Sequence, residues 1–273
     1  MKGRVLIVAG SDSGGGAGIQ ADIKAVTALD GFGMTAITAL TAQDTRGVHG
    51  VVGVDPAFIA QQMALVLADL GADAIKTGML HSAAVIGTVA TVLAAQAPTV
   101  PVVVDPVMVA KGGHRLLQEA AERTLIERLL PRATVVTPNL PEAEALAGFT
   151  IANETDMVRA GRAVLALGPK AVLVKGGHLD GSPEVVDLLV SADGVTRFSH
   201  PRIATRSTHG TGCTLASAIA CGLAQHLTLI DAVGRARDYV RRAIETAPGF
   251  GSGHGPLNHA VTFDPAWRDR ADR

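Results

Sequence analysis

The class of fold is indicated by the run Val5-Leu6-Ile7-Val8-Ala9-Gly10-Ser11-Asp12-Ser13-Gly14-Gly15-Gly16-Ala17-Gly18. Its first five residues are apolar without alternation, which is typical of a parallel strand that is buried on both faces. A glycine-rich loop comes next, and a helix is then expected over Gly18–Leu29, with Ile19, Ile23 and Val26 on its buried face. A strand, a loop and a helix in this order predict an α/β fold.

The same alternation continues along the chain. We expect buried strands at Val5–Ala9, Met34–Leu40, Ala74–Thr77, Val102–Asp105, Thr134–Thr137 and Ala171–Lys175. A helix is expected over Leu116–Leu130. Two later runs, Val185–Ser191 and Val195–Ser199, flank a turn with Asp193-Gly194 and predict an antiparallel hairpin at the edge of the sheet. We interpret residues 1–265 as one domain and residues 266–273 as a charged tail.

Composition excludes several classes of function. The net charge is -1 and aromatic residues make up 3%, so neither nucleic acid nor an anionic membrane is an expected partner. Apolar runs are too short to span a membrane. The chain has two cysteines, which favours a reduced, cytoplasmic protein over a disulfide framework.

Polar and glycine-rich segments follow the carboxyl ends of the expected strands. In open parallel sheets, ligands bind beyond the carboxyl ends of the strands. The polar and glycine-rich segments at these ends are Gly10–Gly18, Thr41–Thr45, Asp105–Gly113, Thr137–Glu142 and Lys175–His178. We therefore predict one ligand-binding cleft at this edge.

The segment Thr208–Thr214 reads Thr-His-Gly-Thr-Gly-Cys-Thr and opens an apolar helix. Glycines at a helix start leave backbone N–H groups approachable, and the helix dipole favours an anion such as a phosphoryl group. Cys213 at this position is predicted to have a lowered pKa. The alternative is a glycine-rich turn with a small buried cysteine. Cys221, in the middle of the helix, is interpreted as core.

Asn139 and Glu142 are three residues apart across another helix start. A carboxylate and an amide on one face suit Mg²⁺ and a phosphate. The same two residues also fit a capping box, with Asn139 as N-cap and Glu142 at the third helical position. Local sequence leaves both interpretations open.

Four single residues are further candidates. Asp105 ends a strand and could bind metal or an ordered water, and Lys175 precedes two glycines and suits a phosphate. Gln43 offers a donor and an acceptor, as an aminopyrimidine edge requires. Asp22 could face the ligand or serve as an N-terminal helix charge. The first loop is not a P-loop, because no Lys-Ser or Lys-Thr pair closes it.

Together these strings resemble the ribokinase-like superfamily, and most closely its hydroxymethylpyrimidine/phosphomethylpyrimidine kinase branch of thiamine biosynthesis. The resemblance is carried by AGSDSGGGAGIQADIK, TALTAQDT, IKTGML, DPVMVA, TPNLPEAEAL, VLVKGGH and HGTGCTLASAIA, in family order, and by the late GPLNH. One departure is Ser-Asp-Ser at residues 11–13, where the family commonly has a proline before the second serine.

The resemblance implies a three-layer α/β/α fold around a mostly parallel sheet, and a homodimer. It implies Mg²⁺-dependent transfer of the ATP γ-phosphoryl group to the hydroxymethyl oxygen, and then to the resulting phosphate. The implied roles are an anion hole at Gly210, Thr211 and Gly212; the catalytic-base position at Cys213; pyrimidine recognition by Gln43; pocket positions at Gly10, Ala17, Met79 and Val107; magnesium and phosphate binding by Asn139 and Glu142; and a nucleotide-side contact by Lys175.

Three other functions stay open. A pyridoxal or pyridoxine kinase acts on a ring that also carries a hydroxymethyl group. A thiol enzyme would form a covalent intermediate with His209 nearby, although a phosphatase of this kind would need Arg where Ile219 stands. A non-catalytic small-molecule sensor on the same fold is the third.

Overall fold

The computed structural model describes residues 1–108, 119–177 and 183–264. Within these ranges a single nine-stranded sheet has the order β3-β2-β1-β4-β5-β6-β7-β8-β9. The strands are β1 Arg4–Asp12, β2 Phe32–Gln43, β3 Val48–Gly53, β4 Ala74–Thr77, β5 Val102–Val104, β6 Val135–Val136, β7 Ala171–Lys175, β8 Glu184–Ser191 and β9 Gly194–Pro201. Strands β2, β1, β4, β5, β6 and β7 are parallel, while β3, β8 and β9 run antiparallel to their neighbours.

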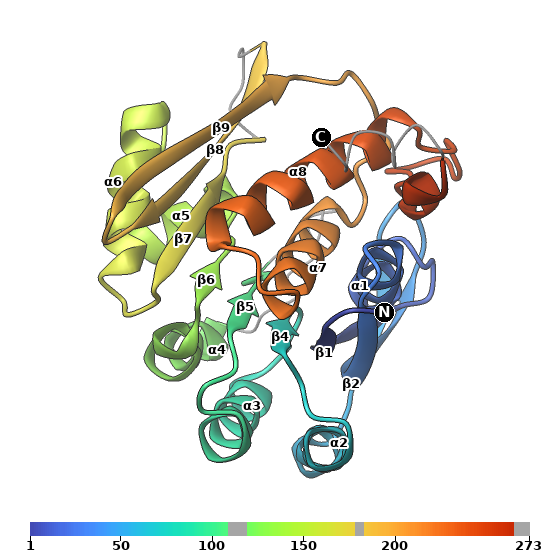
Figure 1. Cartoon of the computed structure of the whole chain (residues 1–273), viewed down its shortest axis with the longest axis vertical. Coiled ribbons are helices and arrows are strands. Elements are labelled where there is room, and N and C mark those ends of the chain that lie inside the picture. Colours follow the sequence, from blue (N-terminus) through green and yellow to red (C-terminus); the bar gives the residue numbers. More distant parts are fainter. Residues whose placement is uncertain (109–118, 178–182, 265–273) are drawn as a thin grey trace.

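Helices cover both faces of the sheet (Figure 1). They are α1 Gly18–Ala28, α2 Pro56–Asp69, α3 Ala83–Gln96, α4 Glu119–Thr124, a π-helical turn Leu125–Leu129, a 3-10 turn Leu130–Arg132, α5 Leu140–Ala147, α6 Glu154–Leu165, α7 Thr211–Ala224, α8 Leu229–Glu245 and a 3-10 turn His259–Phe263. One core lies between the sheet and α2 to α6, and the other between the sheet and α1, α7 and α8. The expected three-layer α/β/α fold is confirmed.

Strand β1 shows why the central strands are apolar throughout. Leu6 and Val8 point into the first core, whereas Val5, Ile7 and Ala9 point into the second. Because each face packs against helices, no polar face is needed. The hairpin predicted at residues 185–199 is confirmed as β8 and β9.

Several sequence-based expectations were wrong in detail. Strand β3 was missed, because its Val-His-Gly-Val-Val-Gly sequence is an exposed edge strand with two glycines rather than a buried run. Ile23 was expected on the buried face of α1, but it is 37% exposed. The strands expected at Val102–Asp105 and Thr134–Thr137 are shorter, at Val102–Val104 and Val135–Val136.

The helix expected over Leu116–Leu130 agrees only in part. Residues 116–118 lie outside the described part of the chain. The described part is α-helical to Thr124, widens into a π-helical turn and tightens into a 3-10 turn that contains Pro131. Proline lacks the N–H that a continuing α-helix requires, so the regular helix ends near it.

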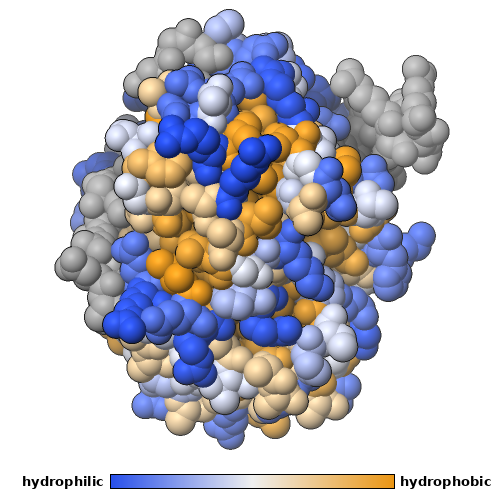
Figure 2. Space-filling model, turned by 90° about the vertical axis from the view of Figure 1, so that its left-hand side faces the viewer, coloured by the Kyte–Doolittle hydropathy of each residue, from blue (hydrophilic) through white to orange (hydrophobic). Residues whose placement is uncertain are grey.

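Two further expectations concern the whole chain. The tail at 266–273 lies outside the described residues, and the single domain over residues 1–265 stays a prediction. Among the described helices, none is long and apolar enough to cross a membrane. Figure 2 shows the side that lies at the left in Figure 1, where apolar patches near the middle are broken up by hydrophilic side chains.

Candidate active site

A cleft of about 1080 Å³ lies at the carboxyl ends of the parallel strands. Thirteen of the fourteen predicted site residues line it: Gly10, Ala17, Gln43, Met79, Asp105, Val107, Asn139, Glu142, Lys175, Gly210, Thr211, Gly212 and Cys213. These residues come from seven separate segments of the chain. The fold therefore brings together nearly every position at which the sequence indicated chemistry, as the strand-end rule predicts.

The start of α7 is packed tightly against the first loop and against charged side chains. Gly210 is the N-cap and has a left-handed φ of 78°. A Cβ at this position would collide with the carbonyl oxygen of Gly16. A Cβ at Gly212 would lie 3.3 Å from Lys175 Nζ. Only glycine permits the approach at Gly210, and the first turn of α7 lies at the wall of the cleft.

Cys213 sits in that first turn, half-buried at the wall of the cleft. Burial raises the pKa of its thiol to about 12, against a lowering effect of Lys76. Asp22 and Asp105 raise the pKa further. The predicted lowering of this pKa was therefore wrong, because desolvation and two nearby carboxylates outweigh the favourable helix start.

Asn139 and Glu142 form the capping box that the sequence left open. Asn139 Oδ1 accepts from the Glu142 N–H at 2.9 Å, and Glu142 Oε2 accepts from the Asn139 N–H at 2.9 Å. Glu142 Oε1 also accepts from the Met108 N–H at 3.4 Å. Burial raises the pKa of Glu142. The capping box is therefore confirmed. The carboxylate of Glu142 also lines the cleft, so capping does not exclude a metal role, which stays a prediction.

Lys175 and Asp105 form an ion pair at the centre of the cleft. Lys175 Nζ lies 3.1 Å from Asp105 Oδ1, which also accepts from the Thr137 hydroxyl at 3.0 Å. Burial pulls the pKa of Lys175 down, but Asp105 and Glu142 raise it above its ordinary value overall. Lys175 therefore keeps its positive charge at neutral pH, as a phosphate contact requires.

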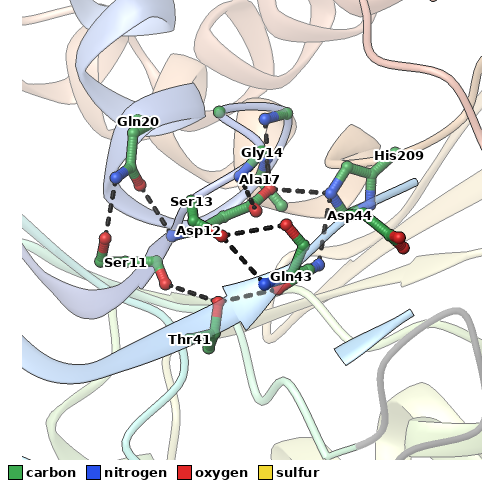
Figure 3. A network of polar contacts seen from close by, with 12 residues as sticks. Ser11, Asp12, Ser13, Gly14, Ala17, Gln20, Thr41, Gln43, Asp44 and His209 are labelled. Carbon is green, nitrogen blue, oxygen red and sulfur yellow. Dashed lines mark hydrogen bonds and ion pairs between the residues drawn. The ribbon is translucent and has the colours of Figure 1, made fainter. Parts of the chain in front are cut away.

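The first loop is ordered around Asp12, which the sequence interpretation missed (Figure 3). Its carboxylate accepts from the N–H groups of Gly14, Gly16 and Ala17 and lies 2.8 Å from His209 Nε2. Burial acts in the opposite direction, yet these bonds hold the pKa of Asp12 below its usual range. An Asp followed by glycines is an Asx-turn pattern, and this signal could have identified the residue.

Gln43 lies at the end of β2, between this loop and His209 (Figure 3). Its Oε1 is 3.1 Å from the Thr41 hydroxyl, and its Nε2 is 3.4 Å from His209 Nε2. Its backbone N–H donates to Ser13 Oγ at 2.9 Å. The amide is thus held at the cleft wall, and its role in recognising a ring edge stays a prediction.

Asp22 is the predicted site residue that the structure places elsewhere. It is fully buried beneath the cleft and is not among the described lining residues. Its carboxylate accepts from Lys76 Nζ at 2.8 Å and from the Ser217 hydroxyl at 2.7 Å. The expected ligand contact was wrong, because α1 turns this residue toward the core. Lys76, which lines the cleft, was missed, although a lysine inside the apolar run Ala74–Thr77 was a visible signal.

An apolar wall completes the site near Gln43. Met79 and Val107 pack with Val48 and Val51, two residues of the unforeseen strand β3. Val107 has a φ of 37°, which is unusual for a β-branched side chain and strained. The strained position lies within the loop that follows Asp105, where its side chain faces the cleft.

Known proteins with similar sequences identify the family of this chain. Residues 12–258 match the family model described as phosphomethylpyrimidine kinase. The chain belongs to the phosphomethylpyrimidine kinase family. A hydroxymethylpyrimidine/phosphomethylpyrimidine kinase of Bacillus subtilis is 47% identical over 94% of each chain. The predicted family and enzyme class are therefore confirmed.

One further relative and one solved structure are similar to this chain over nearly its full length. A thiamine biosynthesis bifunctional protein of Geobacter sulfurreducens is 52% identical over 98% of the chain, which spans 54% of that relative's length. A pyridoxal kinase of Staphylococcus aureus, solved with AMP-PCP and pyridoxal, has a TM-score of 0.88 at 33% identity, covering 97% of this chain and 96% of that one. Both similarities agree with the ribokinase-like fold of the family.

Proposed function

We propose that the chain phosphorylates 4-amino-5-hydroxymethyl-2-methylpyrimidine with ATP, and then phosphorylates the monophosphate to the diphosphate. The observation that carries this proposal is the joining of two kinds of site in one cleft. A fixed amide beside an apolar wall forms one end. A glycine-lined helix start beside the largely buried Lys175 forms the other.

The ring end suits a small aminopyrimidine. Gln43 presents a donor and an acceptor, and Met79 and Val107 offer apolar contact to the ring faces. Gly10 and Ala17 leave room beside them, since a Cβ on Gly10 would lie 3.2 Å from Met79 Sδ. A ring bound in this way would direct its hydroxymethyl group toward Cys213, which lines the same cleft.

The other end suits a nucleoside triphosphate. Lys175 and the N–H groups of Gly210 to Cys213 would hold phosphoryl oxygens, as positively charged and partly positive donors. Farther along the cleft, Ile203, Val240 and Ile244 would contact the base. ATP use is supported by the S. aureus relative, which was solved with an ATP analogue.

Magnesium is proposed from the donor chemistry of the cleft. In the described part of the chain, no three metal-binding side chains form a cluster. Mg²⁺ in kinases is held by one or two carboxylates together with substrate phosphates, so Glu142, with Asn139 beside it, is a fitting donor. When bound, the ion would neutralise charge on the β- and γ-phosphates.

The reaction needs an acceptor for one proton. The hydroxymethyl oxygen forms a bond to the terminal phosphorus while the bond from phosphorus to the ADP oxygen breaks. Cys213 as thiolate takes the alcohol proton and later releases it to solvent. Its raised pKa makes the thiolate a minor species but a strong base. Positioning and charge stabilisation by Lys175 and the α7 start supply most of the rate.

The assay that tests this function is product analysis with Mg-ATP and hydroxymethylpyrimidine. We expect the monophosphate first and the diphosphate later, each with stoichiometric ADP. Pyridoxal is assayed in parallel, because a structural relative is a pyridoxal kinase. Faster turnover of pyridoxal would overturn the substrate assignment, and binding of the ring without ADP formation would favour a sensor. A homodimer and a cytoplasmic location remain proposals, which sedimentation and fractionation would test.

A further inference from the structure

Lys76 is a charged residue in the middle of the central sheet. It pairs with Ile7 of β1 and Val103 of β5, and its side chain is 0% exposed. Its Nζ donates to Asp22 Oδ2 at 2.8 Å, and Asp22 is equally buried. Burying an ion pair is often less stabilising than an apolar pair of similar volume. With apolar neighbours on both sides, an apolar residue would suit this position, so the charge calls for another explanation.

The ammonium group reaches the carboxyl end of β4, where the cleft begins. A Cβ on Gly78 would lie 2.7 Å from Lys76 Nζ, so the glycine leaves space for the ammonium. Lys76 also lines the cleft. An ammonium has three N–H donors, and among the described residues Asp22 is its hydrogen-bond partner. The ammonium of Lys76 is thus held by Asp22 and lies beside the cleft.

Helix α7 connects this pair to Cys213. Ser217, whose hydroxyl donates to Asp22 at 2.7 Å, is four residues after Cys213 and hence one turn farther along the same helix face. The charged groups that act on the thiol are Lys76 and Asp22 below it, and Asp105 and Lys175 beside it. Both lysines are ion-paired, but among the described residues only Lys76 is linked through its carboxylate partner, Asp22, to Ser217 on the helix that carries Cys213.

We propose that Lys76 is a positioning residue of the reaction, whose buried ammonium, anchored by Asp22, stabilises the thiolate of Cys213. Its place in catalysis rests on the proposed kinase function, but its effect on the thiol does not. Lys76 keeps its three protons throughout, while Cys213 gains and loses the alcohol proton. The pKa directions agree: burial raises the pKa of Cys213 and Lys76 lowers it. Burial likewise pulls the pKa of Lys76 down, yet Asp22 and Cys213 raise it above its usual value.

The test measures the alkylation rate of Cys213 in the full-length chain without substrate. A Cys221→Ser background leaves Cys213 as the single thiol, and the serine hydroxyl remains a donor on the side of the carbonyl oxygens that Cys221 Sγ contacts. Iodoacetamide is applied at about pH 9, and modification is followed by intact mass. Only the thiolate reacts, so loss of the Lys76 charge in Lys76→Met should slow alkylation by about tenfold or more. Looser packing has the opposite effect, because it exposes the thiol and speeds alkylation.

Two further variants keep the result interpretable. Lys76→Met leaves Asp22 without its cation, so Lys76→Met/Asp22→Asn removes both charges and should recover thermal stability. Its alkylation should be faster than that of Lys76→Met, because Asp22 raises the pKa of the thiol, but still slower than that of the wild type, because the effect of Lys76 is the larger of the two. Lys170→Met removes an exposed lysine away from the cleft and should leave alkylation unchanged. Unchanged or faster alkylation in the folded double variant would overturn the proposal. If alkylation slows but no variant or wild-type chain forms ADP, the thiol–lysine coupling stands and the kinase assignment fails.

Discussion

The two ends of the cleft are built in different ways. At the phosphoryl end, Asp105 and Glu142 are buried and Lys175 is largely buried, and each of these side chains is fixed by at least one hydrogen bond or ion pair. At the ring end, an amide and an apolar wall lie against β3, an exposed edge strand. If the proposed function holds, the first end should control the rate through preorganised charge, while the second should control which ring is bound.

The largest effect is expected at Cys213. Cys213→Ala should lower kcat by about 10²- to 10⁴-fold, which is the usual contribution of a general base. Cys213→Asp should retain more activity than the alanine variant, because a carboxylate can accept the same proton. Burial raises the pKa of this thiol to about 12, so its thiolate fraction rises with pH throughout the neutral range. Wild-type kcat should therefore rise with pH, whereas kcat of Cys213→Asp should not.

The measurement is kcat as a function of pH for the three proteins, with folding checked by circular dichroism. Near wild-type turnover of Cys213→Ala would make Cys213 a packing residue and leave the rate to the anion hole and Lys175.

The next effect separates metal binding from capping at Glu142. Glu142→Gln should reduce activity by about 10- to 100-fold and require more Mg²⁺, since one carboxylate charge is lost. Asn153→Ala provides a matched control, because Asn153 caps α6 away from the cleft by accepting from the Asp156 N–H. Its loss should cost about 1 kcal/mol of stability and leave the Mg²⁺ response unchanged. Equal Mg²⁺ titrations of Glu142→Gln and wild type would reduce Glu142 to a cap.

At the ring end, Gln43→Leu should weaken pyrimidine binding by about 1–3 kcal/mol, because a polar ring edge would be buried without a partner. The KM for ATP should stay constant, since Gln43 contacts Ser13, Thr41 and His209 and none of the described residues proposed to hold the phosphates. Calorimetry with the pyrimidine, alongside ATP kinetics, makes this comparison. A parallel loss of ATP affinity would contradict the division of the cleft into two ends.

The smallest effect concerns acid stability at Asp12. Its folded-state pKa is lowered, so the carboxylate stabilises the fold above its unfolded pKa of about 4, and this stability is lost as the pH falls through the folded value. Asp12→Asn should cost about 1 kcal/mol near pH 7 and less at acid pH. Urea unfolding at both pH values tests the sign, and an equal cost at both would exclude an ionic contribution.

The sequence predicted the sheet and the set of cleft residues better than it predicted their electrostatics. Buried strands such as β4 and β7 are recognisable because both faces are apolar, and their ends then locate the ligands. Strand β3 escaped because an exposed edge strand needs no apolar pattern. The pKa of Cys213 was misjudged because a local motif shows the helix start, but not the desolvation and carboxylates that other segments supply. Asp12–His209 and Lys76–Asp22 join distant segments, and such pairs are invisible in local sequence.

The close approach of Gly210 to the carbonyl of Gly16 has a consequence for engineering substrate scope. With no side-chain atoms between the two backbones, the loop of Gly16 and the start of α7 pack directly against each other. His209 connects them again through its contact with Asp12. An insertion or a larger residue in either loop would displace the other and spoil the phosphoryl end. Libraries that aim at bulkier rings should therefore diversify Met79 and the neighbouring valines of β3, where an exposed edge strand can yield without moving the anion hole.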